Sequence, residues 1–183
     1  RSTIADLDAA CADAQAALNS VPPTQREAAT QDLDRPYRDG HSRPRALLYN
    51  PADGLLYVAL STADRVAVID VQARPARIVT SIDTGPFPQA LAALPDGDVL
   101  VVCRYDPALG VIGRDPATRA PADRYRRLAA GSVHGLRGVA VHRSGRVVVA
   151  SPALTALQLL DPDGALVQTV ETDLGPRTVR IVP

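Results

Sequence analysis

The 183-residue sequence predicts an all-β fold of repeated four-stranded antiparallel sheets, preceded by a short helical arm. Three observations predict it. Short runs rich in Val, Ile and Leu alternate with turn signals, which is typical of strands. These runs recur in one register three times after residue 43. Residues 1–43 instead place apolar residues at the three- and four-residue steps of a helix.

The repeat is clearest in the two central strands of each unit. They are expected at Leu56–Leu60 with Val66–Asp70, at Val99–Cys103 with Leu109–Gly113, and at Val147–Ser151 with Leu157–Asp161. The last residues of the two runs are ten residues apart in all three copies. A chance succession of strand-like runs would not keep that spacing, so the chain is built from repeats.

A shorter strand precedes each central pair, and an outer strand follows it. The first strands are expected at Pro44–Leu47, Pro88–Leu91 and Leu136–Val139, with a fourth copy at Pro176–Val179, at intervals of 44, 48 and 40 residues. Turn signals follow at Asp53-Gly54, Asp96-Gly97 and Ser144-Gly145, and the outer strands at Arg77–Asp83, Arg124–Ala129 and Leu166–Thr172. Four antiparallel strands in about 40–45 residues are typical of a β-propeller blade. We therefore expect an arm at 1–43, blades at 44–87, 88–135 and 136–175, and the start of a further blade at 176–183.

The first repeat resembles the YVTN-type β-propeller repeat. It has Pro51-Ala52-Asp53-Gly54 before Leu56-Tyr57-Val58, and then Val66-Ala67-Val68-Ile69-Asp70. The Thr-Asn positions of that pattern are Ala59-Leu60, Val102-Cys103 and Ala150-Ser151 here. The resemblance implies a propeller that serves as a scaffold, as a lactonase-like enzyme or as part of a periplasmic redox protein. It also implies a periplasmic or extracellular location.

A closed ring needs more blades than this sequence supplies. Propellers have at least four blades, because an open end leaves a blade face bare. We therefore expect the ring to be completed by the rest of a longer protein or by another chain. The absence of Met, at residue 1 and throughout the sequence, favours a fragment over a symmetric assembly.

The arm is expected to form an amphipathic helix with one apolar face. That face carries Ile4, Leu7, Cys11 and Leu18. We expect it to dock on the propeller rim or on a partner chain. Cys11 and Cys103 are expected to be buried small apolar residues, and a disulfide between them stays an alternative in an oxidising compartment.

Arginine recurs at one position of the first-strand pattern. Its second residue is Arg45, Gln89, Arg137 and Arg177 in the four copies. First strands line the channel of a propeller, so these side chains are expected at one mouth of it. Guanidinium groups bind carboxylate or phosphate, which predicts an anionic ligand there. The alternative is solvated arginines, or arginines paired with Asp39, Asp83 and Asp173 in the preceding connections.

Two histidines precede first strands and are candidates for the same mouth. His41 and His134 are candidate contacts for a metal or for a haem held by another domain, although two ligands make a poor metal site. No cofactor motif is present. The second blade also has a long insertion, Asp115 to Arg127, which is expected to be a partner-docking loop. Its basic residues are Arg119, Arg124, Arg126 and Arg127.

Composition excludes several classes of protein. The formal net charge is zero, and five Tyr with one Phe leave few stacking platforms, which argues against nucleic-acid binding. No apolar run approaches the roughly 20 residues of a transmembrane helix. No nucleophile elbow or phosphate-binding loop appears, and Ser132 near His134 lacks a third member. The sequence thus predicts a non-catalytic propeller module that docks onto partners. The alternatives are the propeller part of a periplasmic oxidoreductase and a lactonase-like hydrolase.

Overall fold

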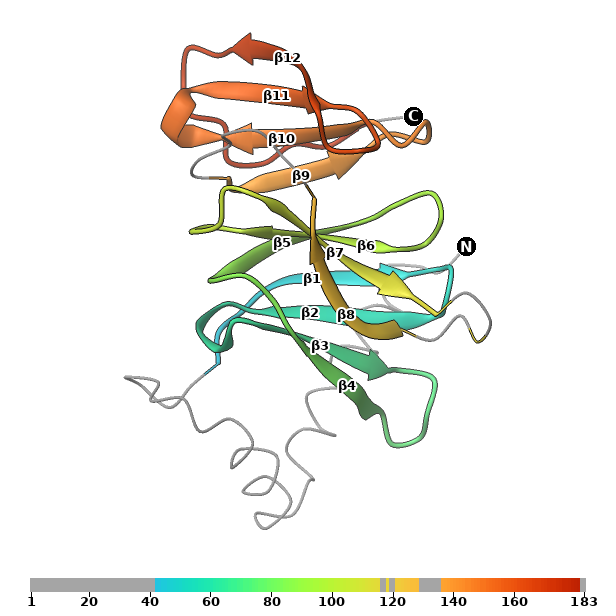
Figure 1. The fold of residues 1–183 in the computed structure, drawn as a ribbon. Coiled ribbons are helices and arrows are strands. Elements are labelled where there is room, and N and C mark those ends of the chain that lie inside the picture. Colours follow the sequence, from blue (N-terminus) through green and yellow to red (C-terminus); the bar gives the residue numbers. More distant parts are fainter. Residues whose placement is uncertain (1–41, 116–117, 119–120, 129–135, 182–183) are drawn as a thin grey trace.

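The computed structural model describes residues 42–115, 118, 121–128 and 136–181. Within them the chain forms three antiparallel sheets of four strands each (Figure 1). The first sheet is β1 (Pro44–Asn50), β2 (Leu55–Leu60), β3 (Arg65–Asp70) and β4 (Arg77–Asp83). The second is β5 (Pro88–Ala93), β6 (Val99–Cys103), β7 (Leu109–Arg114) and β8 (Pro121–Arg127). The third is β9 (Gly138–Val141), β10 (Val147–Ser151), β11 (Ala156–Leu160) and β12 (Leu166–Glu171).

The sheets follow one another along the chain, and their first strands lie side by side. β1 contacts β5, and β5 contacts β9, while β4 and β8 meet on the outside. Each sheet runs in sequence order from inner to outer strand. Two short 3₁₀ turns, Ser61–Ala63 and Pro152–Leu154, join the central strands of the first and third sheets. This arrangement confirms the predicted all-β fold of partial propeller blades.

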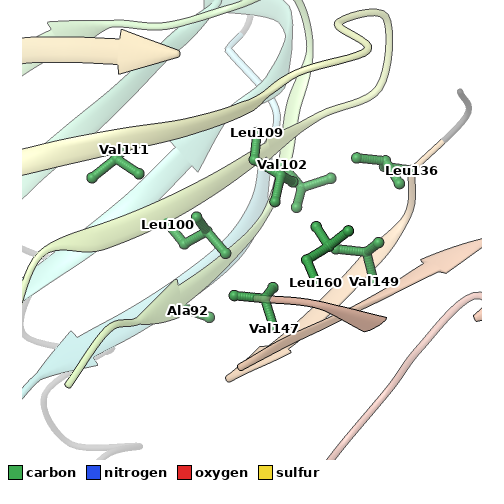
Figure 2. Close-up of a cluster of buried hydrophobic side chains, with 9 residues drawn as sticks. All are labelled: Ala92, Leu100, Val102, Leu109, Val111, Leu136, Val147, Val149 and Leu160. Atoms are coloured by element: carbon green, nitrogen blue, oxygen red, sulfur yellow. The ribbon is translucent and has the colours of Figure 1, made fainter. Parts of the chain in front are cut away.

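Strand alternation explains why the sheets stack. Successive side chains point to opposite faces, so each central strand supplies two apolar faces. Tyr57 and Val68 of the first sheet pack against Val99 and Ile112 of the second. The other face of the second sheet packs against the third in a cluster of nine buried residues, shown in Figure 2. They are Ala92, Leu100, Val102, Leu109, Val111, Leu136, Val147, Val149 and Leu160.

The turn between β1 and β2 shows why Asp-Gly pairs recur. Gly54 has a φ of 75° and donates its N–H to the carbonyl of Asn50 at 2.8 Å. Asp53 accepts the Leu55 N–H at 3.0 Å and the Tyr57 hydroxyl at 2.7 Å. The buried Asn50 amide donates to the Gly97 carbonyl at 2.8 Å, so this turn is tied to the corresponding turn of the second sheet.

Three sequence-based expectations need correction. The strand expected at Pro176–Val179 does not form. The third inner strand begins at Gly138 rather than Leu136: its pairing with β10 ends where Gly138 lies opposite Ala150, and Leu136 precedes it, buried in the core cluster. The expected docking loop, Asp115 to Arg127, is largely strand: β8 begins at Pro121 and pairs with β7. The predicted helix at Ile4, Leu7, Cys11 and Leu18 lies outside the described residues. In the part of the chain that is described, no helix is long and apolar enough to span a membrane.

Candidate functional site

The residues that begin the inner strands gather at one end of the stacked sheets. Arg45 is the second residue of β1, Gln89 the second of β5, and Arg137 directly precedes β9. Residues 176–181 form no strand, but their backbone lies against β9. A Cβ placed on Gly138 would come within 2.8 Å of the Arg177 carbonyl oxygen. The fourth copy of the pattern thus lies beside the third.

Three of the four predicted residues, Arg45, Arg137 and Arg177, form a group of positive charge. Arg104 belongs to the same group. Partial burial and the guanidinium groups of Arg104, Arg177 and Arg45 lower the pKa of Arg137 from its ordinary value. The positive charges of these three side chains thus act on Arg137, and Arg45 and Arg104 also lie against one aromatic ring, that of Phe87. We call Arg45, Arg104, Arg137 and Arg177 the arginine cluster.

Among the described residues, none of these four arginines forms an ion pair with a carboxylate. Other arginines do: Arg65 pairs with Asp83 at 2.7 Å, and Arg77 with Asp70 at 3.5 Å. Asp83 and Asp173 were alternative partners for these arginines, but Asp83 lies on β4 beside Arg65, and, within the described part of the chain, Asp173 forms no ion pair with any of the four. Asp39 lies outside the described residues.

Two aromatic side chains hold part of the arginine cluster in place. The rings of Phe87 and Tyr105 pack edge to face with centroids 5.6 Å apart. The Arg45 guanidinium carbon lies 5.7 Å from the Phe87 ring centroid. That of Arg104 lies 5.8 Å from Phe87 and 5.2 Å from Tyr105. Such cation–π contacts orient the guanidinium planes.

Phe87 has an unusual backbone, with a φ of 60°. Its N–H donates to the Asp64 carboxylate at 2.9 Å, and its carbonyl accepts the Arg104 N–H at 2.9 Å. A left-handed conformation is costly for a bulky residue and persists only where neighbours enforce it. These bonds fix the ring beside the arginines.

Sequence reasoning did not find Phe87, Arg104 or Tyr105. Arg104 and Tyr105 follow the end of β6, and Phe87 precedes β5. In the register of the repeat, Arg104 is equivalent to Ser61 and Pro152, so the repeat pattern does not mark it. Gln89 differs from the arginines, because its amide nitrogen donates to the Leu136 carbonyl and ties the second blade to the third.

The other predicted contacts fall on different parts of the molecule. Arg124 and Arg126 are exposed on β8, the outer strand of the second sheet. Arg127 pairs with the buried Asp106, and that carboxylate balances its positive charge. His41, His134, Arg119, Ile4, Leu7 and Leu18 lie outside the described residues. The described part of the chain contains no group of three or more His, Cys, Asp or Glu arranged to hold a metal.

Cys103 is a buried, free thiol at the interface of the first two sheets. Its Sγ lies 3.8 Å from the Tyr125 hydroxyl. Burial raises the pKa of Cys103 to about 11, so the thiol stays protonated and unreactive at neutral pH.

The third sheet has a second apolar face that belongs to none of the buried clusters. Val148, Leu157 and Leu159 alternate with the residues that pack against the second sheet, and they are half-buried. In the register of the repeat, Val148 corresponds to Leu100, through which the second sheet packs on the third. We call Val148, Leu157 and Leu159 the open face.

Comparison with known proteins identifies the fold but not the family. No protein-family model matches the sequence, and no curated protein matches it. Solved structures of β-propeller proteins do. Hydrazine synthase of Kuenenia stuttgartiensis is 19% identical with a TM-score of 0.55, over 78% of this chain and 42% of that one. Virginiamycin B lyase of Staphylococcus aureus is 12% identical with a TM-score of 0.62, over 76% and 46%. A 6-phosphogluconolactonase-like protein of Bacteroides fragilis is 16% identical with a TM-score of 0.63, over 78% and 42%.

At these identities the likeness shows the fold alone. The chain also spans less than half the length of these three propeller proteins. Their names include a synthase, a lyase and a lactonase-like protein, so the shared architecture is compatible with several chemistries.

Proposed function

We propose that this chain is a non-catalytic part of a β-propeller, a binding module that docks through its open face onto further four-stranded blades. The rest of a longer protein or another chain supplies those blades. The observation that carries the proposal is the open face itself. Val148, Leu157 and Leu159 repeat the pattern by which the second sheet packs on the third, and no described sheet covers them.

Two further facts support it. A propeller blade buries both faces in a closed ring, so an apolar face that is only half-buried favours association. The matched propeller proteins are more than twice the length of the segment that they share with this chain, which leaves room for about four more blades. The YVTN-like pattern and a periplasmic or extracellular location belong to the same proposal.

The native particle mass tests this proposal. Size-exclusion chromatography with light scattering is expected to give a particle heavier than the single chain of 19.3 kDa. In the 183-residue chain by itself, whose open face only another chain can cover, Leu157→Arg places a charge on that face and is expected to release the chain as a monomer. Val167→Arg makes the same change at an exposed position of β12 and is expected to leave the particle intact. A wild-type particle of one chain contradicts the proposal, as does release by both variants.

The oxidoreductase alternative predicts a different observation. A propeller that holds a haem or copper centre carried elsewhere gives a Soret or copper absorption band in the native particle. The lactonase-like alternative predicts lactone hydrolysis by the purified particle. A particle that shows a band or hydrolyses lactones is not the non-catalytic module proposed here.

A further inference from the structure

We propose that the arginine cluster, with Phe87 and Tyr105, is a binding site for a small polyanion that carries two or more phosphate or carboxylate groups. The proposal adds a ligand to the molecule and does not rest on the docking of further blades. Within one chain, Arg45 of the first sheet and Arg104 of the second lie against Phe87, and the backbone of Arg177 lies against β9 next to Arg137.

The first argument is charge. Four guanidinium groups share one end of the stacked sheets, and no described carboxylate pairs with any of them. What sets the group apart from single exposed arginines is that Arg45 and Arg104 lie against one ring, Phe87, while Arg137 and Arg177 lie at the same end of the sheets. Repulsion among like charges disfavours this arrangement until an anion enters. A polyanion would accept bidentate hydrogen bonds from several guanidinium groups at once.

The second argument is preorganisation. Arg45 and Arg104 lie against the Phe87 ring, and Arg104 also lies against Tyr105. The rings limit the rotamers of these long side chains, so less entropy is lost when they bind. Arg45 and Tyr105 are exposed, and a small ligand can therefore reach the group from solvent.

The third argument is the backbone of Phe87. Two other repeats have glycine, Gly135 and Gly175, at the equivalent position before the inner strand. The repeat therefore does not require a phenylalanine there. This one adopts a φ of 60°, held by the Asp64 carboxylate. Such strain in a bulky residue is typical of functional sites, and here it places the ring between two arginines.

The test is thermal denaturation and calorimetric titration of the full chain with pyrophosphate and with citrate, at constant ionic strength. Either probe is expected to raise the melting temperature, whereas acetate is not. Arg104→Gln and Arg137→Gln are each expected to weaken the binding at least about tenfold, as the loss of one charge-assisted contact predicts. A response to pyrophosphate alone assigns phosphate groups, and a response to citrate alone assigns carboxylates.

The matched control is the double variant Arg143→Gln with Arg146→Gln. These exposed arginines flank the turn between β9 and β10, at the other end of the third sheet from Arg137. The control changes the net charge more than either test variant, and it is expected to change affinity less than twofold. Equal weakening by the control would mean diffuse attraction and would overturn the site.

A second readout separates a binding role from a structural one. Without a ligand, Arg137→Gln removes repulsion and is expected to leave the melting temperature unchanged or higher. If Arg137→Gln unfolds the chain, Arg137→Lys keeps the charge but not the planar fork, and it is expected to weaken binding with the fold intact. No binding of either probe at about 10 mM, or an unchanged affinity in the Arg104 and Arg137 variants, overturns the proposal.

Discussion

Leu160→Ala tests whether stacking of the second and third sheets stabilises this protein. Leu160 has no exposed surface and lies in the cluster between those sheets (Figure 2). The change deletes three carbon atoms, worth roughly 2.4 kcal/mol of transfer free energy at about 0.8 kcal/mol each. The cavity that remains adds to this, so the free energy of unfolding is expected to fall by about 3–4 kcal/mol.

Leu166→Ala is the matched control, because Leu166 lies opposite Leu160 across the β11–β12 pair. Leu166 is 49% exposed, so the same deletion is expected to cost less than about 1 kcal/mol. In urea denaturation with a slope of about 2 kcal/mol per M, the midpoint is expected to fall by about 1.5–2 M for Leu160→Ala and by less than about 0.5 M for Leu166→Ala. Equal shifts for the two variants would refute this account of the core.

Two further predictions concern the interface of the first and second sheets. Burial raises the pKa of Cys103 to about 11, so the thiol ionises at a lower pH in the unfolded chain than in the folded one. The free energy of unfolding is therefore expected to fall as pH rises from about 9 to 11. Cys103→Val removes this contribution, which amounts to about 2–3 kcal/mol of unfolding free energy at pH 11. Urea denaturation of both proteins at pH 7 and pH 11 measures the difference. An identical pH dependence in both proteins contradicts the prediction. Gly110→Ala puts a methyl group into the Tyr125 ring, so it is expected to cost about 2–4 kcal/mol and to speed alkylation of Cys103. Gly113→Ala on the same strand meets only Asp98 at 3.6 Å and is the control; equal effects of the two changes would count against the packing described here.

The strands could be predicted because the repeat fixes them. The buried faces of β2, β6 and β10 require apolar residues at alternate positions, and three copies in one register leave little freedom. The turns could be predicted for a similar reason, since Asp53 accepts the Leu55 N–H that the turn leaves unpaired. β8 was partly mistaken for a loop, because Pro121 and Asp123 are residue types that rarely form strands.

The candidate site could be predicted only in part, for a physical reason. Arg45, Arg137 and Arg177 share one position of the repeat, so periodicity places them at one end of the sheets. Arg104 and Phe87 come from connections, and connections are where repeats differ. The Phe87 ring also contacts Arg45 of the first sheet, and no spacing within one copy of the repeat encodes that contact between blades.

The two proposals meet at Arg177, which gives them a testable thermodynamic link. Arg177 belongs to the segment that lies against β9 beyond the third sheet, and it is one of the four guanidinium groups of the arginine cluster. Blades docked on the open face would fix that segment and so reduce the entropy lost when a polyanion orders Arg177. Coupling of this kind is reciprocal: a polyanion that binds more tightly to the assembled particle must also favour its assembly by the same factor. Pyrophosphate or citrate is therefore expected to shift the wild-type chain toward the heavier particle, and Arg177→Gln to weaken that shift.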